Sequence, residues 1–199
     1  MLPWLRMDRR WILGGVLLAG GVGVVRVLTQ RPRFDEHSKI LLIGDTFANG
    51  LSPHLQTLAT DEDLPFLFGA KNGTNLEEWV NSEWLLRKLE EFSPTHVLIS
   101  LGTTDAYSPV SPEQVAEDVA ELVALIQEHQ AHPIWIGEPA LPDVYAGLSP
   151  NEEVLDAIQE HAPYYFNSSE ISIPRGPDGL HPTATGYAGW AALIWNWLS

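Results

Sequence analysis

A carboxylate and an imidazole lie three residues apart near the C-terminus, in the string Asp-Gly-Leu-His-Pro at residues 178–182. At this spacing a carboxylate can reach the Nδ1–H of the ring within one turn, which fixes the tautomer and stabilises the imidazolium. The Nε2 atom can then take a proton from a hydroxyl, and a hydroxyl is a weak nucleophile without such a base. We therefore predict that Asp178 and His181 activate a nucleophile from a rigid turn held by Gly179 and Pro182.

Thr46 is the candidate nucleophile, in a Gly-Asp-Thr string at residues 44–46 that follows an apolar run. Two further polar strings also follow apolar runs, Asn-Gly-Thr at residues 72–74 and Gly-Thr-Thr-Asp at residues 102–105. These strings must meet in space if they are to form one site, and the elements that carry them decide whether they do.

Five short apolar runs recur along the chain, and segments with helical periodicity separate them. The runs are residues 39–43, 65–68, 96–101, 133–136 and 164–166. A short continuous apolar run is typical of a strand buried on both faces of a parallel sheet. Parallel neighbours need right-handed crossovers and helical cover on both faces, so we predict an α/β fold, a three-layer α/β/α sandwich with about five parallel strands. Ligands gather at the carboxyl ends of such strands, which is where the polar strings lie.

Helix signals support this arrangement. Ser111 is a predicted N-cap, followed by Pro at the first helical position and Gln114 at the third, which makes a capping box. The Ser-Pro-Asn-Glu string at residues 149–152 repeats this opening and predicts a second helix with the same start. The last helix is predicted over residues 183–197, with an aromatic stripe that is more typical of a core than of a ligand site.

The order of these strings resembles that of the SGNH/GDSL hydrolase family. Its Gly-Asp-Ser, glycine, Gly-x-Asn-Asp and Asp-x-x-His-Pro blocks come in the same order, and the resemblance covers about residues 38–199. It implies the flavodoxin-like fold of that family and a catalytic triad of Thr46, Asp178 and His181. Thr46 stands where the family has serine, and its branched Cβ places a methyl group beside the path of attack.

The resemblance also implies an oxyanion hole, which would be formed by the backbone N–H groups of Thr46 and Gly73 and by the side chain at position 104. The first two donors are independent of side-chain type. Position 104 is threonine where the family has asparagine, and a hydroxyl sits nearer the backbone than an amide nitrogen does.

Each of these residues also has a purely structural interpretation. Asp178 and Gly73 are ordinary turn residues, Thr46 is a suitable helix N-cap, and His181 suits the start of a helix. Taken together they favour a site, because turn formation gives no reason for a hydroxyl, a glycine and an Asp-x-x-His string to recur at strand ends.

Charge and composition exclude several functions. The chain has a formal net charge of −15, and residues 34–199 hold five Lys/Arg against 25 Asp/Glu, a net of −20. Such a body repels phosphate backbones, so we expect no nucleic-acid partner. The chain has no cysteine, which excludes disulfides and thiolate chemistry. His129 and His132 are spaced like metal ligands but lack a third ligand, so we predict no metal, and no cofactor motif is present.

The first 33 residues form a separate predicted region. Arg6, Arg9 and Arg10 precede an uncharged run at residues 11–25, which residues 27–28 extend. At about 1.5 Å per residue this helix nearly spans a bilayer. We therefore predict a signal-anchor at residues 1–33 and an extracytoplasmic body at residues 34–199, or a secreted body if the segment is cleaved.

Three functions follow from the sequence. The first is an ester hydrolase or acyl (acetyl) transferase that acts on a small acyl ester or an acetylated glycan. The second is a catalytically degenerate domain that binds a glycan or a protein through the same pocket. The third is a structural component of an assembly whose hydrophobic arm packs against neighbours; no oligomeric state is predicted.

Overall fold

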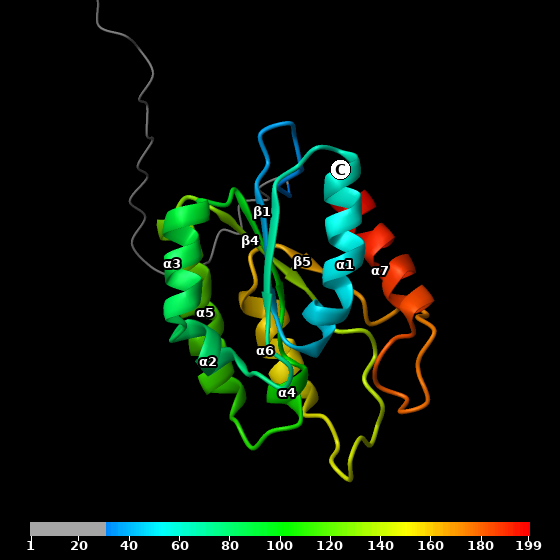
Figure 1. Ribbon diagram of the computed structural model, residues 1–199. Helices are drawn as coiled ribbons and strands as arrows, with labels where there is room; N and C mark the ends of the chain where they lie inside the picture. Colours follow the sequence, from blue (N-terminus) through cyan, green and yellow to red (C-terminus); the bar gives the residue numbers. More distant parts are fainter. Residues whose placement is uncertain (1–30) are drawn as a thin grey trace, which may run out of the picture. The chain divides into compact units, whose positions relative to one another are not determined.

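Five parallel strands form one sheet in the part of the chain that the computed structural model describes, residues 31–199 (Figure 1). The strands are β1 (Ile40–Gly44), β2 (Phe66–Ala70), β3 (His96–Ser100), β4 (His132–Ile136) and β5 (Tyr165–Phe166). Their order across the sheet is β2-β1-β3-β4-β5, with every neighbouring pair parallel. The predicted strands are confirmed to within two residues at each end, because fully buried strands leave continuous apolar runs in the sequence.

Helices cover both faces of the sheet, which confirms the predicted three-layer sandwich. They are α1 (Thr46–Asp61), α2 (Leu76–Val80), α3 (Glu83–Phe92), α4 (Thr103–Ala106), α5 (Pro112–Glu128), α6 (Glu152–His161) and α7 (Ala184–Leu198). Figure 1 shows α1 and α7 side by side on one face, and α2, α3 and α5 on the other.

Alternate residues of each strand point into two separate cores. Ile40 and Leu42 of β1 pack with α1 and α7, where Trp190 and Ile194 are fully buried. Leu41 and Ile43 pack in the opposite core, which α2, α3, α5 and α6 complete. The aromatic stripe of the last helix is therefore core, as the sequence predicts.

The helix starts agree with the sequence in two of three places. Ser111 accepts a hydrogen bond from the Gln114 N–H at 3.2 Å, and Thr183 caps α7 in the same way. The predicted start at Ser149 is wrong. The N-cap of α6 is Asn151, two residues later, because Asn151 is extended and its Oδ1 accepts from the Glu153 N–H at 3.1 Å.

The backbones of β1 and β3 pack closely at Gly44, the first residue of the Gly-Asp-Thr string. Gly44 has a φ of +153°, and a Cβ atom at this residue would lie 2.0 Å from the carbonyl oxygen of Ser100 on β3. Only glycine fits there, so β1 and β3 come close together just before α1 begins.

No helix within residues 31–199 is long and apolar enough to cross a bilayer. The apolar run of the predicted anchor lies outside the described residues.

Candidate active site

Asp178 and His181 form a hydrogen-bonded pair in the loop that precedes α7. The Asp178 Oδ2 lies 2.6 Å from the His181 Nδ1, and Oδ1 accepts the backbone N–H groups of Leu180 and His181, each at 3.1 Å. Gly179, with a φ of +73°, makes the tight turn between them. The hydrogen bond from His181, followed by those from the backbone, holds the pKa of Asp178 below its usual value. Asp178 is therefore an ionised acceptor that orients the ring.

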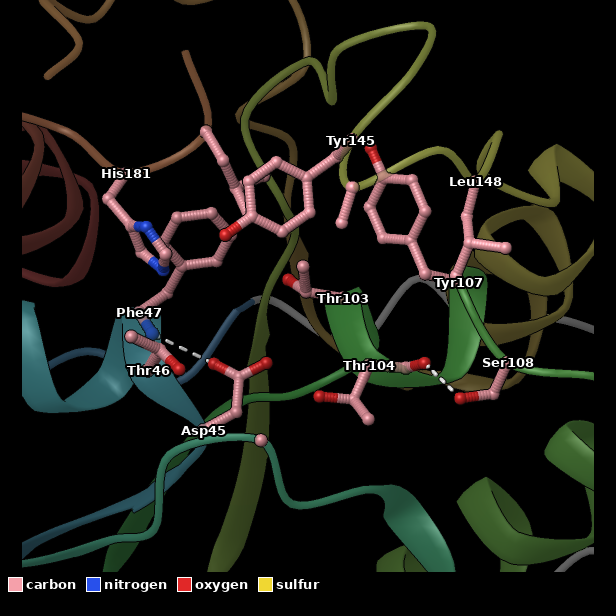
Figure 2. Close-up of a pocket in the computed structure, with 13 residues that line it drawn as sticks. Asp45, Thr46, Phe47, Thr103, Thr104, Tyr107, Ser108, Tyr145, Leu148 and His181 are labelled. Carbon is pink, nitrogen blue, oxygen red and sulfur yellow. Dashed lines mark hydrogen bonds between the residues drawn. The ribbon is translucent and has the colours of Figure 1, made fainter. Parts of the chain in front are cut away.

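Thr46 is the first residue of α1 and lines the same pocket as His181. The residue before it, Asp45, is the N-cap, and its carboxylate accepts the Phe47 N–H at 2.9 Å. Figure 2 shows the His181 ring extending over Thr46 and Phe47. In the described structure the Thr46 hydroxyl makes no hydrogen bond to His181, whose Nδ1 is paired with Asp178. Hydrogen bonds between catalytic groups are often long or absent before substrate binds.

The three predicted oxyanion donors also line this pocket. Gly73 lies in the loop after β2 with a φ of +71°, a conformation that favours glycine, and no atom lies within 4 Å of where its Cβ would be. The Thr46 N–H is one of the unpaired donors at the N-terminus of α1. Thr104 lies on α4, and Figure 2 shows its hydroxyl turned toward the Asp45 side of the pocket.

The pocket itself has a volume of about 350 Å³ and mostly apolar walls. The lining residues are Asp45, Thr46, Phe47, Gly73, Thr103, Thr104, Tyr107, Ser108, Tyr145, Ala146, Leu148, Leu180 and His181. Several come from the loop between β4 and α6, which has no periodic pattern that would reveal its position in the sequence.

Two aromatic rings hold His181 from different sides. The Phe47 ring lies 5.8 Å from the imidazole, centroid to centroid, and the Tyr145 ring lies 6.4 Å away, edge to face. Tyr107 restrains the loop that carries Tyr145, because its hydroxyl donates to the Pro142 carbonyl at 2.8 Å. These contacts limit how far the base can move.

Arg175 connects the His181 loop to the loop after β4. Its guanidinium donates to the carbonyl oxygens of Leu180 and Ala140. The neighbouring Gly176 N–H donates to the His181 carbonyl at 2.8 Å. Arg175 thus ties the loop that carries Asp178 and His181 to the loop after β4, a role that its sequence position does not indicate.

Three buried acidic side chains belong to segments that contribute to the pocket: Asp45 before α1, Asp105 on α4 and Glu138 in the loop after β4. Asp45 is 1% exposed, Asp105 is 3% exposed and Glu138 is 6% exposed. Burial raises the pKa of Asp45 to about 7 and that of Asp105 to about 6, and it raises the pKa of Glu138 well above its usual value. Glu138 lies two residues beyond β4, so the rule that polar residues past strand ends are functional candidates also applies to it.

Comparison with known proteins identifies the family. A model of the GDSL-like lipase/acylhydrolase family matches residues 43–188. The lipase/acylhydrolase from Enterococcus faecalis is a similar solved structure, 19% identical with a TM-score of 0.64, over 80% of this chain and 94% of that one.

Two further structures share the fold. The psychrotrophic esterase EstA from Pseudoalteromonas sp. is 19% identical with a TM-score of 0.62, over 80% of this chain and 95% of that one. LAE5, an α/β hydrolase enzyme from the metagenome of Lake Arreo, Spain, is 16% identical with a TM-score of 0.62, over 83% of this chain and 98% of that one. The family match includes both the Gly-Asp-Thr string and the Asp-Gly-Leu-His string, and the chain therefore belongs to the GDSL-like lipase/acylhydrolase family of ester-hydrolysing enzymes.

Proposed function

We propose that this protein hydrolyses or transfers the acyl group of a small ester through a Thr46–His181–Asp178 triad. The observation that carries the proposal is the 2.6 Å contact between Asp178 and His181 Nδ1, with Thr46 in the pocket that the same ring lines. This arrangement gives a hydroxyl, a base and a group that orients the base, as nucleophilic catalysis requires.

In the proposed reaction the Thr46 oxygen attacks the ester carbonyl and His181 Nε2 takes the hydroxyl proton. The tetrahedral intermediate collapses when His181 returns that proton to the leaving alcohol, which leaves an acyl group on Thr46. A water molecule or an acceptor hydroxyl, deprotonated in turn by His181, releases the acyl group. Asp178 stabilises the imidazolium in both steps, and its depressed pKa keeps it ionised for this role.

Negative charge on the carbonyl oxygen would be stabilised by the N–H groups of Thr46 and Gly73 and by the Thr104 hydroxyl. The two N–H groups come from rigid positions, the first turn of α1 and a glycine turn. Preorganised donors of this kind typically contribute about 10²–10³ in rate each.

The pocket favours a small neutral acyl group. Its volume of about 350 Å³ is near the lower end of ligand pockets, and its walls are mostly aromatic and aliphatic. The excess of acidic residues in the body disfavours an anionic substrate. Acetyl groups on an envelope glycan fit these conditions, and we propose them as the target.

We also propose that residues 1–33 anchor the enzyme, with the body outside the cytoplasmic membrane. The basic flank and apolar run of the sequence support this. Fractionation of the full chain tests it: we expect recovery with membranes and release by detergent, and recovery in the soluble fraction without detergent would contradict it.

Hydrolysis of a short-chain activated ester by the purified protein tests the triad. We expect activity in the wild type and its loss in Thr46→Ala and His181→Ala. Thr60→Ala, an exposed threonine on the same helix, is the matched control and should keep full activity. Full activity in Thr46→Ala would exclude Thr46 as nucleophile. If only Thr46→Ser is active, the protein is better described as a degenerate, binding form of the fold.

A further inference from the structure

Within residues 31–199, Glu138 is buried in the loop after β4 with no hydrogen-bond partner for its carboxyl group. It is 6% exposed, and neither carboxyl oxygen has a hydrogen-bond partner within residues 31–199. An isolated ionised carboxylate in such a place costs far more free energy than a neutral acid does. Its burial therefore favours the protonated form.

Asp45, which is buried in the pocket wall, is the acidic group that acts most strongly on Glu138. The negative charge of Asp45 is the second cause, after burial, that raises the pKa of Glu138. The Thr103 hydroxyl lies close enough to lower the pKa of both carboxyls, although it makes no hydrogen bond of ordinary geometry. Figure 2 shows Thr103 and Asp45 on neighbouring parts of the pocket wall.

The groups around Asp45 and Glu138 would not neutralise two negative charges if both carboxyls were ionised. Asp105 on α4 adds a third carboxyl, and Tyr165 on β5 and Tyr187 on α7 have pKa values that burial, the largest cause, and the nearby acids raise. Arg175 lowers the pKa of Glu138 least among the causes, and its guanidinium donates to the Leu180 and Ala140 carbonyls rather than to Glu138. A single proton on the pair relieves this repulsion at the lowest cost.

Repulsion between an ionised Glu138 and Asp45 would displace Asp45, and with it the proposed nucleophile Thr46. The Asp45 carboxylate caps α1 through the Phe47 N–H at 2.9 Å, and Thr46 lies between these two residues. A shift of Asp45 would move the Thr46 hydroxyl relative to His181, and small displacements of reacting groups are costly in rate.

We propose that Glu138 is a positioning residue: it keeps a proton at neutral pH, so that the Asp45–Glu138 pair bears one negative charge and Asp45 holds Thr46 in place. The role of Asp45 in positioning rests on the proposed function of Thr46. The retained proton does not, and it can be measured separately.

Infrared difference spectroscopy tests whether Glu138 retains its proton. At pH 8, above the pKa values of Asp45 and Asp105, we expect a carbonyl band of a protonated carboxyl group in the wild type. The band should vanish in Glu138→Gln and remain in Glu160→Gln, the same substitution at an exposed glutamate on α6. Absence of the band in the wild type, or its persistence in Glu138→Gln, would overturn the proposal.

Ester hydrolysis tests the positioning. Glutamine is uncharged at every pH and keeps a polar group of the same size at this position, so Glu138→Gln should retain kcat within about threefold at pH 7 and lose any alkaline decline that the wild type shows. Leucine is also uncharged but leaves the buried Asp45 carboxylate beside an apolar side chain, and Glu138→Leu should lower kcat at least about tenfold with KM within about twofold. Equal kcat in the glutamine and leucine variants would overturn the positioning role. An inactive wild type would instead overturn the proposed function and leave the infrared result intact.

Discussion

Thr104 is the proposed oxyanion donor whose side chain should matter most for the rate. Its hydroxyl lies nearer the backbone than an asparagine amide would, so its reach toward a developing oxyanion is poorer. We predict that Thr104→Asn raises kcat about tenfold, because it adds a better-placed donor. Thr104→Val, which has the same shape without the hydroxyl, should lower kcat about tenfold or more. Steady-state kinetics on an activated ester decide this, and equal rates in both variants would remove Thr104 from the oxyanion hole.

The chemistry of single residues could be predicted in part. Asp178 and His181 are only three residues apart, so the sequence contains all that their contact requires, and the structure has it at 2.6 Å. The protonation of Glu138 could not be predicted, because it depends on how deeply the loop after β4 is buried. The aromatic contacts of His181 with Phe47 and Tyr145 depend likewise on loops that meet only in the folded chain.

At the scale of elements, Arg175 connects two loops that carry the site. It donates to carbonyl oxygens of Leu180, beside the proposed base His181, and of Ala140, beyond β4. Arg175→Leu should lower kcat about ten- to a hundredfold with little change in KM, because His181 loses its alignment with Thr46. Arg87→Leu removes an exposed arginine on α3 and serves as the control. Kinetics identical to those of the wild type would show that the loop holds its position without Arg175.

The elements themselves were largely predictable. Buried parallel strands leave unmistakable apolar runs, and Ser111 and Thr183 cap helices as their positions predict. The start of α6 was predicted wrongly because two capping residues, Ser149 and Asn151, stand two positions apart and only backbone conformation selects between them. The loop between β4 and α6 has no repeating pattern, so its part in the pocket wall was not predictable.

For the whole molecule, the buried acids make stability depend on pH in an unusual direction. Asp45 and Asp105 have pKa values of about 7 and about 6 in the fold, against an ordinary value of 3.8. The folded state therefore binds more protons than the unfolded state between about pH 4 and pH 7. The stabilisation is complete below pH 3.8, the pKa of these groups in the unfolded chain. It is lost as the pH rises through their pKa values in the folded state, about 6 and about 7. Burial lowers the pKa of His96 to about 4, so His96 acts the opposite way between about pH 4 and pH 6.5, but it is one group against three buried acids. The lowered pKa values of Asp178 and Glu91 also act the opposite way, but they belong to exposed groups and contribute little.

We predict that the melting temperature falls from pH 5 to pH 8 by at least about 3 °C, the shift that roughly 1 kcal/mol produces in a domain of this size. Glu138→Gln should flatten this dependence by removing one of the coupled acids. Glu160→Gln is the same substitution at an exposed position and should leave the slope as in the wild type. Calorimetry across this range provides the measurement, and a melting temperature that is constant or rises with pH would contradict the prediction.

The central claim is that Thr46 is the activated nucleophile of this pocket. Phosphonate esters react with activated hydroxyls, and the Pseudoalteromonas esterase was solved inhibited by monoethylphosphonate. Mass spectrometry after treatment with a reactive ethylphosphonate should find a single modification on Thr46, faster in Thr46→Ser and absent in Thr46→Ala. Modification of Ser108 or another hydroxyl of the pocket, or labelling unchanged in Thr46→Ala, would contradict the claim.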